Sequence, residues 1–378
     1  MSIQPCVALD LGATKVACAI GLPHEHAPGF ELLGSSVVAY PVLSDGWLGD
    51  PLMVSRTIEQ ALEATAVSAE FQRALITINH PLLVSEQARA VVSLGDEPMT
   101  VRAQDLDRLH TTVLNQVLPI DREALMVERL GCTGNGFDGV RDPRGLSATR
   151  LSGTFHILTM PVAARRALIQ AVESAGLEVA QVTYTLAAAL ASMETDTLRH
   201  KRVLMIDVGG LTTDVGLFVE GVLHRVAVVP WGGIKLATSI ATRLQVTMEQ
   251  GVAWSLEGMA CRKSEVRALI ESEWASLQQA ITHLLKNQPR PNAVLLSGRG
   301  ALIDGLAEWV ERTAGIPTSF CRSPRASRLG DLSRQVGLSS AIGLLVTATQ
   351  TSNGFALRSP RLFNRLLDKT RTVLTEYF

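Results

Sequence analysis

The stretch from Arg202 to Gly216, RVLMIDVGGLTTDVG, constrains the fold more than any other part of the chain. An apolar run typical of a buried strand leads to Asp207, then to two glycines and two threonines, and the chain resumes as a second strand. Glycines at such a turn let backbone N–H groups approach an anion, and the threonines add hydroxyl donors. The pattern predicts a phosphate-binding hairpin, with an ordinary β-hairpin as the alternative.

The same pattern occurs near the N-terminus of the chain. Residues 7–9 form an apolar run, residues 16–20 form another, and between them lie Asp10, Gly12, Thr14 and Lys15. Two hairpins of this kind predict two similar half-domains that face each other across a cleft, with an anion between them.

Two further glycine-rich turns precede expected helices. The turn SGRG, which contains Arg299, follows the apolar run AVLL, and the turn PWGG ends in Gly232 and Gly233. Backbone N–H groups at a helix start can bind a phosphate, and a glycine turn can lie against a flat base. Simple loop glycines are the alternative at both places.

Composition excludes several classes of protein. The chain of 378 residues has 35 basic and 36 acidic side chains and only 4% aromatics, which argues against a nucleic-acid-binding protein. The five cysteines form no CxxC pair, so a disulfide scaffold and a thiolate metal site are not expected. No apolar run is long enough for a spanning helix, and the N-terminus has no signal-peptide pattern. We therefore expect a cytoplasmic protein.

Periodicity predicts an α/β chain with a small inserted domain. The inserted domain has the order β-α-β-β, with a helix at 103–116, strands at 124–130 and 149–158, and glycine-rich loops at 131–145. Other helices are expected at 53–66, 162–175, 186–193, 234–244, 248–259 and 264–285. The first half is expected in two parts, 1–84 and 162–201, with the inserted domain at 85–161 between them. The second half is expected at 202–349, with a reduced small subdomain at about 234–290. A linker at 350–358 and a C-terminal helix at 359–378 follow.

The last twenty residues have the pattern of an amphipathic helix. Their apolar side chains fall on one helical face and their basic side chains form a rim beside it. This arrangement predicts a helix that lies in a membrane interface and is attracted by anionic lipid, with a helix packed on the body as the alternative. The apolar face comprises Leu362, Phe363, Leu366, Leu367, Val373, Leu374, Tyr377 and Phe378, and the rim comprises Arg361, Arg365, Lys369 and Arg371.

The motifs together resemble the actin, Hsp70 and sugar-kinase superfamily and, within it, the bacterial cell-division protein FtsA. The resemblance covers nearly the whole chain and rests on ALDLGATKVACAIG, GLSATRLSGTFHILT, GLEVAQV, IDVGGLTTDV, VLLSGRGALIDGL and SSAIGLL. It implies an actin-like ATPase fold, with two ribonuclease-H-like half-domains around a nucleotide cleft. The place of the inserted domain is the most specific point of the resemblance.

The resemblance to FtsA also implies a function. The chain is expected to be a peripheral protein on the inner face of the cell membrane at the division site, which polymerises head to tail and links the FtsZ ring to anionic lipid. The implied partners are the C-terminal tail of FtsZ, further copies of the chain, and other division proteins through the inserted domain. The alternatives are a PilM-like cytoplasmic adaptor of a pilus or secretion assembly, and a nucleotide-free degenerate member of the superfamily.

The resemblance further implies a site for ATP and Mg²⁺. The expected metal residues are Asp10 and Asp207, which would hold Mg²⁺ through its waters. Most of the other expected contacts come from the two hairpins and the two glycine-rich turns. The residues implied for the nucleotide are Gly12, Ala13, Thr14, Lys15, Gly209, Gly210, Leu211, Thr212, Gly232, Gly233, Gly298, Arg299 and Leu302.

Some positions depart from the FtsA pattern. Val252 and Ser255 replace the Glu and Lys that approach the ribose in the family, and Arg299 replaces a small residue of the adenosine motif. Glu271 and Glu273 lie where the family uses basic residues to bind the FtsZ tail. The helix at 186–193 offers only small apolar side chains where related ATPases carry a polar group, so we expect at most slow ATP hydrolysis. No residue is a candidate for the catalytic Asp of a small-molecule kinase.

Overall fold

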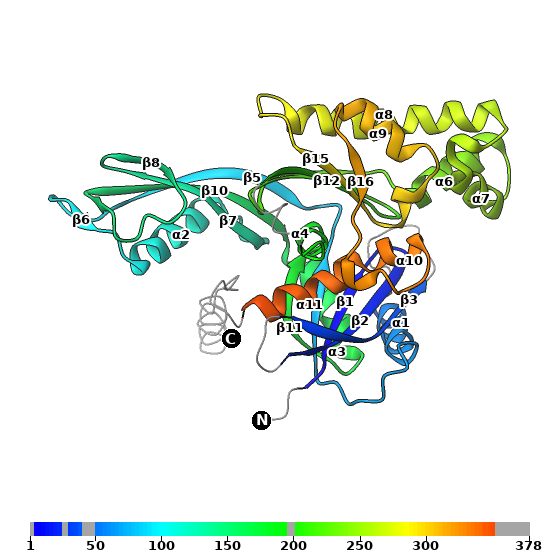
Figure 1. The fold of residues 1–378 in the computed structure, drawn as a ribbon, viewed down its shortest axis with the longest axis horizontal. Helices are drawn as coiled ribbons and strands as arrows, with labels where there is room; N and C mark the ends of the chain where they lie inside the picture. The colour runs from blue at the N-terminus through cyan, green and yellow to red at the C-terminus, as the bar shows by residue number, and fades with distance from the viewer. Residues whose placement is uncertain (1–3, 25–28, 40–49, 195–200, 352–378) are drawn as a thin grey trace.

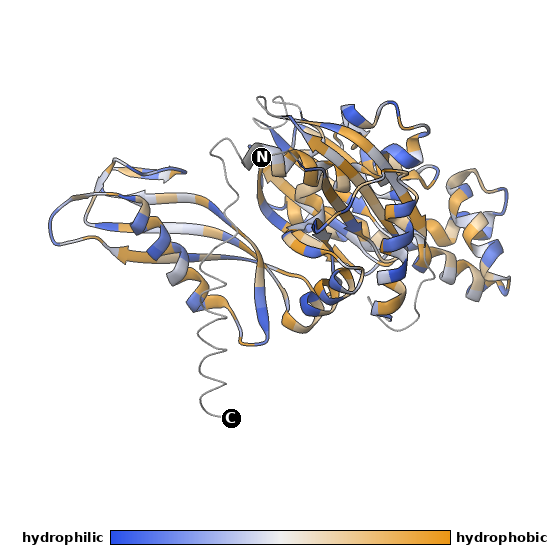
Figure 2. Ribbon diagram, turned by 90° about the horizontal axis from the view of Figure 1, so that it is seen from below, coloured by the Kyte–Doolittle hydropathy of each residue, from blue (hydrophilic) through white to orange (hydrophobic). Residues whose placement is uncertain are grey.

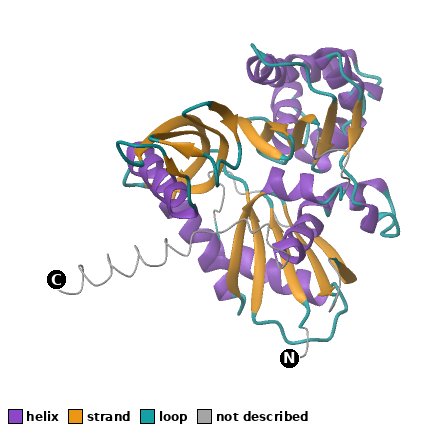
Figure 3. Cartoon of the chain, turned by 60° about the vertical axis from the view of Figure 1, so that its left-hand side comes forward, coloured by secondary structure: helices purple, strands orange, loops and turns teal. Residues whose placement is uncertain are grey.

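The structure, a computed structural model, describes residues 4–24, 29–39, 50–194 and 201–351. Two five-stranded sheets form two halves, and a four-stranded sheet forms an elongated inserted domain that projects away from them (Figure 1). Figure 3 shows the same three sheets from another side. Hydrophobic residues concentrate on the strands of the two central sheets, whereas the helix surfaces carry most of the hydrophilic ones (Figure 2).

The first half is built on a sheet with the strand order β11-β4-β1-β2-β3. β1, β2 and β3 are antiparallel neighbours, and β4 and β11 add in parallel on the other side of β1. Most residues of β1 and β2 are buried, as expected for strands with both faces covered. The strands are β1 (Cys6–Leu11), β2 (Lys15–Pro23), β3 (Phe30–Ala39), β4 (Arg73–Ile78) and β11 (Glu178–Tyr184).

The second half repeats this topology. Its strand order is β14-β13-β12-β15-β16, with the same succession of antiparallel and parallel neighbours. The hairpin β12–β13 therefore occupies the same place in its sheet as the hairpin β1–β2. The strands are β12 (Arg202–Val208), β13 (Thr213–Val219), β14 (Val222–Val229), β15 (Ala293–Ser297) and β16 (Thr318–Phe320).

Helices cover both faces of the first sheet. Two of them pack against the side chains of Val7 and Leu9, whereas the last helix packs against the other face, where Ala8, Ala17 and Ala19 let it come close. Residues 339–349, expected in the second half, thus form the cover of the first half. The helices of this half are α1 (Pro51–Glu63), α3 (Val162–Ser174), α4 (Thr185–Ala191) and α11 (Ser339–Thr351).

The second sheet has its own apolar core on one face. Leu204 and Ile206 of the sheet pack there with Trp274 of the longest helix, and the other face packs against the first half through Met205 and Leu186. The helices that follow the hairpin are α6 (Gly233–Leu244), α7 (Met248–Glu257), α8 (Ser264–Leu285), α9 (Leu306–Ala314) and α10 (Leu332–Gly337).

The inserted domain is a four-stranded sheet of order β5-β10-β7-β8 with one helix on its apolar face. Leu109 and Val113 of that helix pack on Phe155 and Ile157 of the sheet. The region 131–145, expected as loops, contains the end of β7 and all of β8, because the glycines of a regular hairpin resemble those of a loop. The elements are β5 (Val84–Ser93), β6 (Met99–Thr100), α2 (Ala103–Val117), β7 (Arg122–Gly134), β8 (Phe137–Val140), β9 (Ser147–Ala148) and β10 (Arg150–Pro161).

Of the predicted linker and C-terminal helix, the structure describes only the first two linker residues. The amphipathic helix expected at 359–378 lies outside the described residues, as does most of the expected linker. Gln350 and Thr351, the first linker residues, belong to α11. Within the described ranges, none of the helices combines the length and the apolar character needed to cross a bilayer.

Candidate functional site

The turns of the two equivalent hairpins meet between the halves. In the first turn the N–H of Gly12 donates to the carbonyl of Lys15 at 3.0 Å, and in the second the N–H of Gly209 donates to the carbonyl of Thr212 at 3.0 Å. The two turns thus share the same backbone hydrogen bond. A Cβ atom added at Gly210 would clash with the methyl group of Thr14, so the turns touch here.

Each hairpin carries a buried carboxylate with a hydroxyl partner. The hydroxyl of Thr77, on the parallel neighbour β4, donates to Asp10 Oδ1 at 2.6 Å. In the second half the hydroxyl of Ser297, on β15, donates to Asp207 Oδ1 at 2.6 Å. Burial raises the pKa of Asp207 to about 6, the Ser297 hydrogen bond opposes this shift, and the negative charge of Asp10 adds to it.

The two carboxylates suit a hydrated Mg²⁺ ion. Magnesium is commonly held by one or two carboxylates while it keeps several waters. The charges of Asp10 and Asp207 act on each other, and a divalent cation would neutralise both. Among the described residues, no group of three or more His, Cys, Asp or Glu side chains converges as a direct metal site.

Lys15 connects the first hairpin to the end of the chain. Its Nζ donates to the carbonyl of Gly337, at the end of α10, at 2.5 Å, and lies 3.5 Å from Asp10 Oδ2. Only 12% of the Lys15 side chain is exposed. The Lys15 ammonium is therefore held between Asp10 and the end of α10.

A third carboxylate, which sequence reasoning did not select, lies beside Asp207. Asp214 is the direct cross-strand neighbour of Asp207 and is fully buried. The hydroxyl of Tyr184, at the end of β11, donates to Asp214 Oδ2 at 2.6 Å. Burial raises the pKa of Asp214 to about 7. The signal was present in the motif TTD, but the partner comes from a strand that is distant in sequence.

The turn after β15 packs against the end of β12. Gly298 has φ +77°, and a Cβ atom there or at Gly300 would collide with Val208, so both positions need glycine. Arg299 is exposed, and its Cγ lies near Gly337, where an added Cβ would be 3.4 Å from it. Leu302 ends the short 3₁₀ helix of this turn. Arg299 and Lys15 thus approach the same residue, Gly337, from opposite halves.

The glycine pair before α6 lies against the second hairpin. The N–H of Gly233 donates to the carbonyl of Gly209 at 3.0 Å, and the N–H of Ile234 donates to that of Gly210 at 2.9 Å. A Cβ at Gly232 would meet both hairpin carbonyls at 2.6 Å. These two helix-start amides therefore hold the turn in place.

The two positions of α7 from which ribose contacts were implied, Val252 and Ser255, carry no charge. Ser255 is buried, and its hydroxyl donates to the carbonyl of Val252 in the same helix at 2.8 Å. Gly251 allows α7 to pack closely on α6, because a Cβ there would lie 2.5 Å from the Ala237 carbonyl oxygen. The helix thus presents packing contacts at the place where the resemblance implies polar ones.

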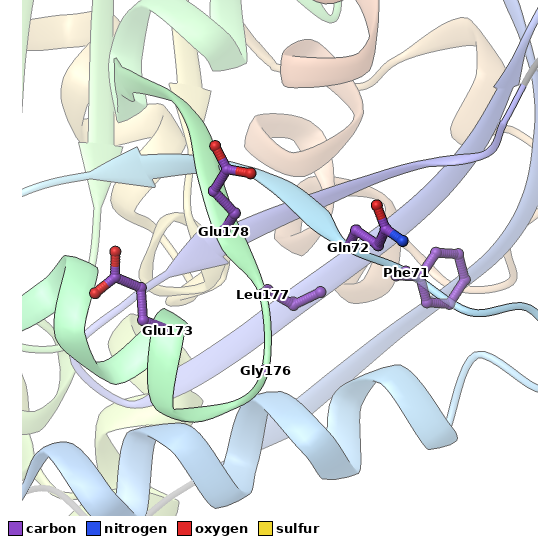
Figure 4. A pocket seen from close by; sticks show the side chains of 6 residues that line it. All are labelled: Phe71, Gln72, Glu173, Gly176, Leu177 and Glu178. Atoms are coloured by element: carbon purple, nitrogen blue, oxygen red, sulfur yellow. The ribbon is translucent and has the colours of Figure 1, made fainter.

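A shallow pocket of about 400 Å³ lies elsewhere, at the opposite end of the first sheet (Figure 4). Its residues Gln72 and Glu178 stand at the starts of β4 and β11, whereas Asp10 and Thr77 stand near the ends of parallel strands. Ligands of open α/β sheets bind beyond the carboxyl ends of the strands. The hairpins, and not this pocket, are the candidate site.

Comparisons with known proteins show similarity to FtsA over most of the chain. The family model for the SHS2 domain inserted in FtsA matches residues 82–159. The cell-division protein FtsA of Pseudomonas aeruginosa is 23% identical, over 93% of this chain and 91% of its own length. FtsA of Escherichia coli K12 is 21% identical, over 90% of this chain and 89% of its own.

Solved structures share the fold at low identity. The chain of a PilM–PilN type IV pilus biogenesis complex has a TM-score of 0.70 and 14% identity, with 92% of this chain and 99% of that chain covered. MreB 5 of Spiroplasma citri bound to AMPPNP has a TM-score of 0.53 and 11% identity, with 93% and 98% covered. The chain has the actin-like ATPase fold with an FtsA-type insertion, and it is FtsA-like over about nine-tenths of its length.

Proposed function

We propose that this FtsA-like chain is a membrane-tethered scaffold of bacterial cell division. The observation that carries the proposal is similarity to FtsA across about nine-tenths of the chain, together with the SHS2 domain inserted at 82–159. In this role the protein binds ATP, polymerises head to tail, and links the FtsZ ring to the inner face of the cell membrane. Other division proteins bind through the inserted domain.

ATP with Mg²⁺ is the proposed ligand of the two hairpins. The turn amides and Lys15 hold the phosphates, and Asp10 and Asp207 orient waters of the cation. Bound Mg²⁺ would neutralise phosphate charge, and the MreB 5 structure, which contains AMPPNP, supports a nucleotide in a cleft of this fold. Helix α4 offers apolar side chains from Leu186 onward, so turnover is slow and the nucleotide acts mainly to hold the halves together.

A calorimetric titration with ATP and Mg²⁺ tests the proposed ligand. Lys15→Ala and Asp207→Ala should each weaken binding by roughly 10- to 100-fold, the usual effect of losing a hydrogen bond or charge contact to a charged group. Lys201→Ala is the matched control, because Lys201 precedes β12 at the end far from the turn. Unchanged affinity in both site variants would place the phosphates elsewhere.

A PilM-like adaptor of a pilus assembly is the second candidate. The structural similarity to PilM, with a TM-score of 0.70 over nearly the full length of that chain, favours it. The two candidates differ in their need for a lipid-binding C-terminus, since only the division scaffold requires residues 359–378 as its own anchor. Lipid flotation, described below for the whole molecule, distinguishes them.

The surface that FtsA relatives are expected to use for FtsZ differs in charge here. Glu271 and Glu273 lie on α8, and Glu273 Oε1 accepts a hydrogen bond from the Ser239 hydroxyl at 3.0 Å. Acidic side chains repel an acidic peptide tail and favour a basic one. FtsZ remains the proposed partner, and co-sedimentation of the chain with FtsZ filaments tests it.

A further inference from the structure

Tyr184 lies in the first half but makes its polar contact with the second. It is the last residue of β11 and directly precedes α4, and its ring belongs to the apolar core beneath these elements. Its hydroxyl donates to Asp214, on β13 of the other half, and both residues have an exposed fraction of 0%. The hydrogen bond thus joins two separately folded sheets inside the molecule.

Asp214 breaks the equivalence of the two halves. In the second sheet the row across the strands reads Ser297, Asp207, Asp214. In the first sheet the equivalent row reads Thr77, Asp10, Ala17. The hydroxyl–carboxylate pair is present twice, whereas the additional carboxylate is present once and is paired across the halves. The first sheet forms with an alanine at the equivalent position, so a sheet of this kind does not require a carboxylate there. The hydrogen bond from Tyr184 suggests the role of Asp214.

A second, weaker contact joins the same elements. Asn79 follows β4 in the first half, and its Nδ2 lies 3.5 Å from the hydroxyl oxygen of Thr212 in the second turn. Thr212 and Asp214 are two residues apart at the start of β13. Separation of the halves would break both contacts and the contact between Thr14 and Gly210.

We propose that Tyr184 is a positioning residue that holds Asp214 and thereby keeps the two phosphate-binding turns in their closed arrangement. In the closed state the buried Asp214 carboxylate has two donors from the first half, the hydroxyl of Tyr184 at 2.6 Å and the side chain of Asn79; in an open state water would replace both. Removing the hydroxyl therefore destabilises the closed state more than the open one. The effect on nucleotide release rests on the proposed function, whereas the effect on closure does not.

The test measures release of a fluorescent ATP analogue with Mg²⁺ from the full-length chain by stopped flow. Tyr184→Phe should speed dissociation by roughly 10- to 100-fold, the usual effect of losing a hydrogen bond to a charged group. Combining it with Asp214→Asn should give less than the sum of the two separate effects, because one change removes the donor of this bond and the other removes the charge of its acceptor. The control is Ser36→Ala, which removes another buried hydroxyl, bonded at 2.6 Å to Ala61 within one half.

Hydrogen exchange without nucleotide provides the second measurement. Tyr184→Phe should increase amide exchange in the 207–214 turn, whereas Ser36→Ala should leave that turn unchanged. If Tyr184→Phe alters neither dissociation nor exchange beyond the Ser36→Ala control, the positioning role is wrong. If the wild-type chain does not bind the analogue, nucleotide binding fails as a function, and exchange in the turn alone decides the role of Tyr184.

Discussion

Buried acids and buried histidines titrate in opposite directions in this molecule. Burial raises the pKa of three carboxyl groups to between about 6 and about 7, and it lowers the pKa of three imidazoles to about 4. An acid whose pKa is raised in the folded state contributes stability that is lost as pH rises through the raised pKa. A histidine whose pKa is lowered contributes stability that is lost as pH falls through the lowered pKa. The carboxyl groups are Asp207 (about 6), Asp214 (about 7) and Glu128 (about 7), and the imidazoles are His80, His156 and His224 (each about 4).

Substituting Asp214 should change how the stability of the protein depends on pH. Because the Asp214 pKa is raised from 3.8 to about 7, its contribution is fully present below about pH 4 and is lost as pH rises through 7. Asparagine does not titrate, so the free energy of unfolding of Asp214→Asn, relative to wild type, should increase by a few kcal/mol between pH 5 and pH 8. Urea unfolding at the two pH values measures it.

Asp142→Asn is the control for this pH dependence. The neighbouring Arg144 side chain, by its hydrogen bond, lowers the pKa of exposed Asp142 to about 2. Its contribution is present above its unfolded pKa and is lost only as pH falls toward 2, so its difference from wild type should be the same at pH 5 and pH 8. If Asp214→Asn also differs from wild type by the same free energy of unfolding at pH 5 and pH 8, the pKa of the buried Asp214 carboxyl group is not raised.

Arg299 should decide how the site accepts a base. Its side chain is exposed and its Cγ lies near Gly337, whereas Val252 and Ser255 of α7 supply no charge. If Arg299 restricts the base pocket, Arg299→Gly should tighten ATP binding in calorimetry. A loss of affinity would instead show that the guanidinium contacts the nucleotide, since arginine stacks on flat π-systems.

Residues of the hairpins were predictable, whereas their partners were not. Asp10, Asp207 and the turn glycines follow one another in a local pattern that the sequence displays directly. Parallel strand pairing brings Thr77 and Ser297 to the site, and contact between the halves brings Tyr184. A local sequence pattern shows neither kind of contact. Residues of these types are also common in strands, so nothing marked them as members of a site.

At the scale of elements, α11 and α4 pack closely where they cross. A Cβ atom added at Gly343 of α11 would overlap the carbonyl oxygen of Ala188 in α4. Alanine is normally about 1 kcal/mol better than glycine inside a helix. Here we expect Gly343→Ala to be destabilising, by roughly 1–3 kcal/mol, because the helices must move apart.

Chemical unfolding measures this difference against Gly233→Ala. A Cβ at Gly233 of α6 would lie 3.9 Å from the Gly209 carbonyl oxygen, which is ordinary contact. The control should therefore change stability little. If Gly343→Ala is as stable as wild type, α11 and α4 do not pack as closely as described.

Helices with clear periodicity were predicted well from the sequence. The sheet against which a helix packs was harder to predict. The helices expected at 103–116 and 264–285 correspond to α2 and α8, within a residue. The sequence of α11 is helical by pattern, but the same apolar and small residues fit either sheet. Only the alanines of β1 and β2, which face α11, show which sheet it covers.

At the scale of the whole molecule, the proposed attachment to lipid would depend on residues 359–378. Burial of half of their apolar side chains, at ~1.5–3 kcal/mol each, is opposed by roughly 1–2 kcal/mol per residue of backbone ordering, so one copy should bind weakly. A polymer presents many copies, which makes attachment firm. Deletion of 359–378 should abolish flotation with anionic liposomes, and Phe363→Asp should reduce it strongly.

The folded state of the truncated chain, checked by circular dichroism and thermal unfolding, is the control for flotation. The described body ends at Thr351, so the deletion removes no residue of α11. If the truncated chain floats as well as the full one, residues 359–378 are not the anchor, and the PilM-like adaptor becomes the better description.

The position of α11 also sets the order in which the protein can be completed during translation. The first sheet begins at β1, but the helix that covers its alanine-lined face begins only at Ser339. A ribosome that adds roughly 5–20 residues per second makes α11 on the order of 20–70 s after β1. Throughout that interval the alanine-lined face lacks the helix that covers it, so the first half cannot complete its packing until the end of the described chain has been made.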